Sequence, residues 1–229
     1  MTLSERVTLV SDLAHLPTRA DIWTSCISRF DARTILELGV WKGEFAESLL
    51  KACSVIERLY LLDSWRNLET WNKPWNVDEE TFRAVYEEAM DRTQIGGDRC
   101  VRLRGTTMEV IDQIPDGSLD LAYVDGDHTL RGISIDLIKA YPKVRPGGIL
   151  GGDDYTPTIW QHSEQFEPSL VCPFAAYFAE SQNAPLIILP FGQFAILKPL
   201  EGEASKFQVI DTTGSYGPRN LVSQVKPRD

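Results

Sequence analysis

The chain has 229 residues, of which 43% are hydrophobic and 24% charged, a size and composition that suit one large domain with a sizeable core. Its formal net charge is −10, and its 23 Lys and Arg residues are scattered rather than gathered in a basic patch. Such a charge distribution repels nucleic-acid phosphates, so we expect no nucleic-acid partner and a small-molecule ligand instead.

Helical and strand patterns alternate along most of the chain, and each apolar strand is followed by apolar residues at helical spacing. The predicted order is helix 19–30, strand 34–38, helix 45–53, strand 58–62, helix 82–90, strand 100–103, a short helix before Pro115, strand 119–124, helix 130–141 and a strand from Ile149 onward. A stretch rich in tryptophan (Trp65, Trp71 and Trp75) lies between the second strand and the next helix.

Two further apolar runs, residues 186–189 and 194–197, flank Pro190-Phe191-Gly192-Gln193 and predict a β-hairpin. The whole pattern predicts an α/β fold: a Rossmann-like, doubly wound, mostly parallel seven-stranded sheet with a C-terminal antiparallel hairpin. We expect an N-terminal helical segment over residues 1–33, a ligand-binding domain over 34–200 and a polar arm or tail over 201–229.

The first strand runs directly into a glycine-containing turn, Gly39-Val40-Trp41-Lys42-Gly43. Glycine allows a tight turn from strand to helix where the backbone approaches a ligand closely. Asp63 ends the second strand, where an acid in this kind of fold accepts hydrogen bonds from ribose hydroxyls. The spacing is not the G-x-G-x-x-G of a dinucleotide site, which favours an adenosine ligand without a pyrophosphate. Taken alone, the two glycines are equally compatible with a plain structural turn.

A second group of polar residues follows the fourth and fifth strands. Asp125-Gly126-Asp127-His128 comes after one strand, and Asp153-Asp154 comes after the next. If the two strands are neighbours, their ends lie roughly 5 Å apart and the acids converge at the ligand-binding edge of the sheet. Crowded carboxylates repel one another unless protonation or a cation relieves them, and Mg²⁺ suits such oxygen ligands. His128 could accept a proton from a substrate hydroxyl there.

Each of these residues also has a structural interpretation. Asp-Gly-Asp favours a turn, Asp127 or Thr129 could cap the following helix, and the Asp153-Asp154 pair could simply end a strand. Thr106 and Thr107 follow the third strand, where this fold often contacts adenine, but a helix cap is an equal alternative. The joint occurrence of the acids and His128 at two strand ends favours a functional site.

The pattern Glu37-x-Gly39-x-x-x-Gly43 followed by Asp63 resembles the first two motifs of class I S-adenosylmethionine (SAM)-dependent methyltransferases. The resemblance implies that the region from Glu37 to Gly43 packs against the methionine part of the cofactor and that Asp63 holds the ribose. The family pattern has glycine where this chain has Trp41, and a bulky residue there is similar to the macrocin O-methyltransferase-like branch.

The stretch from Leu119 to Tyr155 is similar to the same macrocin O-methyltransferase-like family, which methylates sugar hydroxyls with a divalent metal. The resemblance implies that Asp125, Asp153 and Asp154 ligate Mg²⁺ or Mn²⁺, that Asp125 also contacts the cofactor, and that His128 is the general base. Residues 64–77 and 156–184 match nothing in that family and are expected to form the lid and the substrate walls.

We therefore expect a SAM-dependent methyltransferase that acts on a hydroxyl of a small molecule such as a sugar or a natural product. Two alternatives stay open: a methyltransferase without a metal or with other chemistry, and a nucleotide-binding module without catalysis. The sequence shows neither a signal-peptide pattern nor the roughly 18 apolar residues that span a bilayer, so we expect a cytoplasmic protein with no membrane partner. Whether it forms a homo-oligomer is left open.

Overall fold

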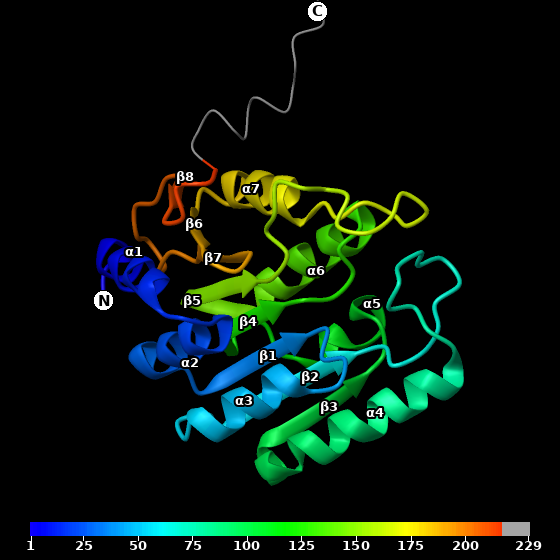
Figure 1. The fold of residues 1–229 in the computed structure, drawn as a ribbon. Helices are drawn as coiled ribbons and strands as arrows, with labels where there is room; N and C mark the ends of the chain where they lie inside the picture. Colours follow the sequence, from blue (N-terminus) through cyan, green and yellow to red (C-terminus); the bar gives the residue numbers. More distant parts are fainter. Residues whose placement is uncertain (217–229) are drawn as a thin grey trace, which may run out of the picture.

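The computed structural model describes residues 1–216, and its centre is an eight-stranded sheet of order β3-β2-β1-β4-β5-β7-β6-β8 (Figure 1). The strands are β1 (Thr34–Leu38), β2 (Arg58–Asp63), β3 (Cys100–Arg104), β4 (Leu119–Val124), β5 (Val144–Gly152), β6 (Pro185–Leu189), β7 (Gln193–Leu197) and β8 (Gln208–Asp211). Strands β1 to β5 pair in parallel, whereas β7 is antiparallel to both β5 and β6. The predicted Rossmann-like, mostly parallel sheet with a C-terminal antiparallel hairpin is confirmed, but it has eight strands instead of the seven expected.

Helices cover both faces of the sheet (Figure 1). One face carries α1 (Leu3–Ser11), α2 (Arg19–Phe30), α3 (Glu44–Ala52) and α4 (Glu79–Thr93), and the other carries α5 (Thr107–Val110), α6 (Leu130–Lys143) and α7 (Val171–Ser181). Each helix buries an apolar stripe against strands that are apolar on both sides. Two hydrophobic cores therefore fill the spaces above and below the sheet.

The parallel register places the C-terminal ends of the central strands at one edge of the sheet. Leu38 at the end of β1 pairs with Leu62 on one side and Val124 on the other, and Val124 pairs with Gly152. The residues that follow these strands therefore meet at that edge, where ligands of open α/β sheets bind.

Helix α2 brings the N-terminal segment close to the same edge. It begins at Arg19 because the Thr18 hydroxyl accepts a hydrogen bond from the Asp21 amide at 3.1 Å. Trp23, on its first turns, packs directly on β5: a Cβ added at Gly151 would lie 2.1 Å from an atom of the indole ring. This close docking positions the start of α2 beside the ends of β4 and β5.

Two parts of the fold differ from the expected boundaries. Strand β5 begins at Val144, not at Ile149, because the backbone pairs with β4 on both sides of a register shift between Leu119 and Leu121. Strand β8 lies in the segment expected to be an arm or tail and pairs in parallel with β6. Its four residues, with only two apolar side chains, are too few to produce a strand signal. The rest of that segment, residues 217–229, lies outside the described residues.

Candidate active site

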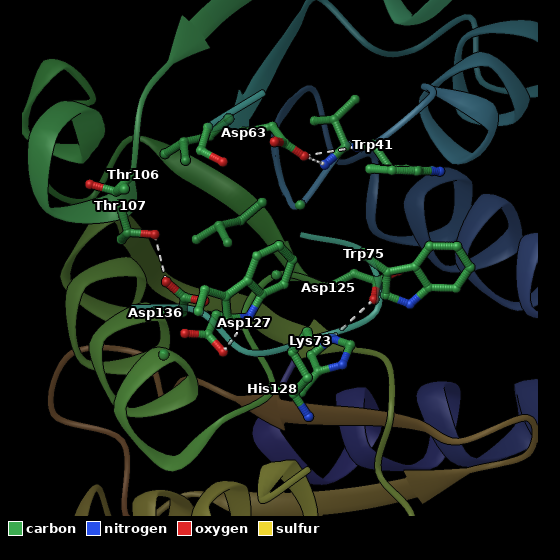
Figure 2. Close-up of a pocket in the computed structure, with 18 of the residues that line it drawn as sticks. Trp41, Asp63, Lys73, Trp75, Thr106, Thr107, Asp125, Asp127, His128 and Asp136 are labelled. Atoms are coloured by element: carbon green, nitrogen blue, oxygen red, sulfur yellow. Dashed lines mark hydrogen bonds and ion pairs between the residues drawn. The ribbon is translucent and has the colours of Figure 1, made fainter. Parts of the chain in front are cut away.

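A cavity of about 590 Å³ opens at the C-terminal edge of the central strands. The side chains that line it come from the strand ends, the start of α2, α6 and the tryptophan-rich stretch (Figure 2). The cavity includes almost all of the residues predicted for the site: Glu37, Gly39, Asp63, Thr106, Thr107, Asp125, His128, Asp153 and Asp154. Gly43 does not line it; this residue precedes α3 with a left-handed φ of 77°.

Asp63 holds the glycine-containing turn in place. One carboxylate oxygen accepts hydrogen bonds from the Val40 and Trp41 amides at 2.9 Å each, and the other accepts one from the Trp65 amide at 2.9 Å (Figure 2). Trp41 has a φ of 51°, in the left-handed region that glycine adopts without strain and that other residues rarely adopt. This backbone conformation explains why the family pattern has glycine where this chain has Trp41. The charged Asp63 acceptor therefore stabilises a turn that carries a bulky residue.

Gly39 marks the closest backbone approach in the site. Its φ is 86°, and an added Cβ would lie 2.0 Å from the carbonyl oxygen of Asp125. No side chain fits between the turn after β1 and the end of β4. The cavity floor is consequently backbone, which leaves room for a ligand above it.

Glu37, at the end of β1, lines the cavity with a carboxyl group that has an unpaired oxygen. Its side chain is 2% exposed, and its Oε2 atom has no hydrogen-bond partner among the described residues. Burial, and secondarily the charge of Asp125, raise its pKa well above the ordinary value. A buried polar atom without a partner is costly, so an unpaired oxygen beside a cavity points to a bound ligand.

Asp125, His128 and Asp154 form a compact cluster whose possible metal-ligating atoms all lie within 4.8 Å of one another. His128 Nδ1 lies 2.5 Å from Asp154 Oδ2, and Nε2 lies 3.4 Å from Asp125 Oδ1, within ion-pair distance but without hydrogen-bond geometry. Burial opposes a charge on His128, but the two carboxylates outweigh it and raise the pKa of the imidazole to about 10. His128 in turn lowers the pKa of Asp154 against the effect of burial.

Asp153 lies beside this cluster but faces different partners. Arg19 forms an ion pair with Asp153 and lies 3.4 Å from Asp125. Gln193, which is fully buried, donates from its amide nitrogen to Asp153 at 2.6 Å, and its amide oxygen accepts hydrogen bonds from Trp23 and Tyr123. Burial and the nearby Asp125 raise the pKa of Asp153 to about 6.

Thr106 and Thr107 lie at the opposite end of the cavity (Figure 2). Thr106 caps α5 through a reciprocal arrangement with Glu109, so the capping interpretation of this residue holds. The Thr107 hydroxyl donates to the buried Asp136 of α6 at 2.5 Å. Burial raises the pKa of Asp136 to about 7, with the Thr107 hydrogen bond acting in the opposite direction.

Two chain segments, residues 64–77 and 156–170, are joined to each other beside the cavity and are called the cover below. The expected second segment, 156–184, was too long, because residues 171–181 form α7 and pack into the core. Lys73 donates to the carbonyl oxygen of Glu167 at 2.7 Å and to the Ser169 hydroxyl at 3.1 Å. The Trp71 indole donates to Asp127 at 3.0 Å, which ties the cover to the turn after β4. The cover is therefore linked to the same turn that carries Asp125 and His128.

The three tryptophans of the first cover segment take different positions. Trp65 is fully buried and donates to the carbonyl oxygen of Trp41, so it packs against the glycine-containing turn. Trp71 and Trp75 line the cavity, and Trp75 is 55% exposed.

Arg19, Lys73 and Gln193 were not foreseen from the sequence. Each lies far along the chain from the strand-end motifs, and none belongs to a recognisable spacing. A helix start predicted at Arg19 was the one available signal, and it does not show which way the side chain points.

A Rossmann-like sheet with a glycine-containing turn, a second-strand acid and acids after β4 and β5 has the organisation of a class I methyltransferase. Residues 36–155, just over half of the chain, match a family described as a methyltransferase domain. The chain belongs to this family, and the resemblance to class I SAM-dependent methyltransferases is confirmed.

One curated relative is mycinamicin III 3''-O-methyltransferase of Micromonospora griseorubida, 30% identical over 142 residues that cover 53% of this chain and 54% of the relative. The chain thus spans about half the length of that relative. Among solved structures, an O-methyltransferase from Bacillus cereus in complex with SAH is 17% identical, with a TM-score of 0.53 and coverage of 86% and 90% of the two chains. TomG of Streptomyces achromogenes, an O-methyltransferase in complex with SAM, is 16% identical, with a TM-score of 0.53 and coverage of 86% and 89%.

These structural likenesses show a shared fold.

Within residues 1–216, every helix is too short or too polar to cross a membrane.

The buried Asp136 generates a prediction for stability. Its pKa is about 7 in the folded protein against an ordinary value of 3.8, so the folded state binds more protons between these pH values. The stability that this group contributes is present below about pH 4 and is lost as the pH rises to about 7. The asparagine of Asp136→Asn cannot lose a proton, so the variant avoids this loss. Because one pKa unit corresponds to about 1.4 kcal/mol, we expect the free energy of unfolding of Asp136→Asn, relative to that of wild type, to increase by roughly 2–4 kcal/mol as the pH rises from about 4 to about 7. Urea unfolding from pH 4 to 8 measures this difference. If the free energy of unfolding of the two proteins changed with pH in the same way, the prediction would be wrong.

Proposed function

We propose that the protein transfers the methyl group of SAM to a hydroxyl group of a small molecule, a sugar or a natural product, with the help of a divalent cation. The observation that carries the proposal is the convergence of the glycine-containing turn, Asp63 and the Asp125–His128–Asp154 cluster on one cavity. A nucleotide-binding module without catalysis has no use for a half-buried histidine between two carboxylates.

The described residues fit the cofactor. Gly39 lets the turn after β1 pack directly against the backbone of Asp125 at the cavity wall, and the unpaired Glu37 oxygen can form a hydrogen bond with a ligand. Asp63 already receives three backbone hydrogen bonds, which fix its carboxylate at the end of β2, where the ribose hydroxyls of a cofactor would lie. Thr106, Thr107 and Asp136 line the end of the cavity expected for adenine.

The strand-end acids also fit a divalent cation. Asp125 and Asp153 already attract a cationic group, the guanidinium of Arg19, and Asp125 and Asp154 contribute ligand atoms to one compact cluster. Carboxylates are the ligands that Mg²⁺ and Mn²⁺ prefer. Asp125, Asp153 and Asp154 would hold the ion, and His128 would lie against it.

The cofactor supplies a methyl group on a positively charged sulfur, and the cation supplies charge that lowers the pKa of an acceptor hydroxyl. Beside Asp125 and Asp154 alone the pKa of His128 is about 10, but the positive charge of a bound cation would lower it and leave the imidazole neutral. His128 would then receive the hydroxyl proton on Nε2, which has no hydrogen-bond partner among the described residues. Asp154 orients the ring through Nδ1 at 2.5 Å. The cover excludes water and positions the acceptor.

The acceptor side of the cavity suits a sugar or another polyhydroxylated molecule. Trp71 and Trp75 offer apolar faces on the cover, while His162 and the carboxylates offer hydrogen-bonding groups. Aromatic side chains with a few polar groups are typical of small-molecule sites. The relative from Micromonospora griseorubida, a mycinamicin III 3''-O-methyltransferase by name, supports a natural-product hydroxyl as the acceptor.

Calorimetry with SAM and with NAD tests the cofactor. SAM should bind, and NAD should bind much more weakly because the turn lacks dinucleotide spacing. Asp63→Ala removes the carboxylate proposed to accept hydrogen bonds from the ribose hydroxyls, and charge-assisted hydrogen bonds are worth about 1.5–3 kcal/mol each, so SAM affinity should fall at least tenfold. Asp116→Ala, an exposed acid paired with Lys143, is the control. Equal or tighter binding of NAD would refute the methyltransferase proposal.

Removal of the cation should abolish methyl transfer. We expect EDTA to stop the conversion of SAM to SAH when a panel of glycosylated natural products is supplied as methyl acceptors, and Mg²⁺ or Mn²⁺ to restore it. Asp125→Asn and Asp154→Asn should each remove a ligand charge and lower Mn²⁺ affinity, measured by electron paramagnetic resonance. Asp112→Asn, an exposed acid beside Lys143, should leave it unchanged. Full activity in the presence of chelator would contradict the role of the cation. The remaining mechanism would then be one in which His128 acts without a metal.

His128→Ala should lower kcat by about 10²–10⁴, the usual contribution of general-base catalysis. SAM affinity should stay near that of wild type, because the residues proposed to contact the cofactor lie mainly after β1 and β2. Single-turnover kinetics on an accepted substrate measure the effect. A variant with wild-type kcat would show that the imidazole only pairs with Asp154, and Asp127 would then be the next candidate base.

A further inference from the structure

We propose that Arg19 binds the carboxylate of the methionine part of SAM. The inference rests on the cofactor proposed above and assigns a residue that lies outside the family match over 36–155. Arg19 is the first residue of α2, and its side chain lines the cavity.

The charges at this end of the cavity require such a group. Arg19 shares the cavity wall there with the carboxyl groups of Glu37, Asp125 and Asp153. The methionine part of SAM carries a positive sulfonium, a positive ammonium and a negative carboxylate. Asp125 and Asp153 attract the two positive groups, but they repel the carboxylate. A ligand carboxylate binds there only if a cation faces it.

Arg19 is the cation best placed to do so. Three other Lys and Arg residues line the cavity in the described part of the chain. Lys42 pairs with Glu88 at 3.0 Å, and Arg131 donates to the carbonyl oxygen of Thr70 at 2.8 Å. Lys73 donates to the carbonyl oxygen of Glu167 within the cover. Lys42 is thus engaged with α4 and Arg131 with the cover. Lys73 lies close enough to Asp127 and Asp154 to interact with their charges, but its ammonium group is held by hydrogen bonds within the cover.

The guanidinium keeps donors available for a ligand. Both carboxylate contacts of Arg19 use Nη1, and within residues 1–216 no hydrogen bond is recorded for Nη2 or Nε. The side chain is 40% exposed, and its guanidinium carbon lies 5.5 Å from the centre of the Phe45 ring, on the first turn of α3. The planar fork can therefore receive a carboxylate while Nη1 stays paired with Asp153.

The sheet order places Arg19 at the end of the cavity where the methionine part of the cofactor would lie. Thr107 follows β3, Asp63 follows β2, and Arg19 contacts the residues after β4 and β5, in a sheet ordered β3-β2-β1-β4-β5. A cofactor with its ribose at Asp63 and its adenine toward Thr107 directs its methionine part toward β4. Its carboxylate then lies on the side of the cavity where Arg19 stands.

Calorimetry with SAM and with decarboxylated SAM, which lacks only this carboxylate, tests the assignment. Wild type should bind SAM more tightly than the decarboxylated form. Arg19→Gln should weaken SAM binding about 10- to 100-fold, the loss expected for charge-assisted hydrogen bonds, and should leave the decarboxylated form nearly unaffected. Arg19→Lys, which keeps the charge but loses the fork, should lose less affinity for SAM. Arg29→Gln, on the exposed last turn of the same helix, is the matched control and should behave as wild type.

Three outcomes would overturn the assignment. An equal loss for both ligands in Arg19→Gln would show that Arg19 acts only through Asp125 and Asp153. Unchanged affinity for SAM in Arg19→Gln would show that the carboxylate binds elsewhere. If wild type bound neither ligand, the cofactor proposal itself would fail, and that result is recognisable without any variant.

Discussion

Carboxyl groups crowd the C-terminal edge of the sheet, and the arrangement of the site follows from the need to balance them. Parallel pairing puts the ends of β1, β4 and β5 side by side, so Asp125, Asp153 and Asp154 cannot move apart. Like charges in a partly buried cavity are costly unless cationic groups face them. Arg19 and His128 meet this requirement in the described structure, and both contact Asp125.

This balance links distant parts of the chain to the site. Arg19 reaches the strand ends because Trp23 packs α2 onto Gly151, and Asp153 is held by Gln193 of the terminal hairpin. The N-terminal helix and the C-terminal hairpin therefore both support the same carboxylate. A methyltransferase needs such rigidity, since methyl transfer depends on the alignment of two bound molecules more than on covalent chemistry by the protein.

The cover is built from loops instead of helices and strands. Its two segments are joined through Lys73 and tied to Asp127 through Trp71. Loops on a rigid scaffold are where a fold acquires its particular substrate, because they change without loss of the core. Trp71 and Trp75 are consequently the residues through which acceptor choice would be altered, whereas Asp63 and Gly39 serve the cofactor side.

The sequence by itself determined the α/β alternation, the hairpin and the strand-end positions of Asp63, Asp125 and His128, because apolar periodicity and glycine turns are local signals. It also indicated the acids that converge after β4 and β5, since neighbouring parallel strands end at one edge. Only the tertiary structure decided that Arg19 faces Asp153 and that β8 joins the sheet. These features depend on contacts between residues far apart in the chain, and no local pattern records which side chain a folded helix or hairpin brings to the cavity.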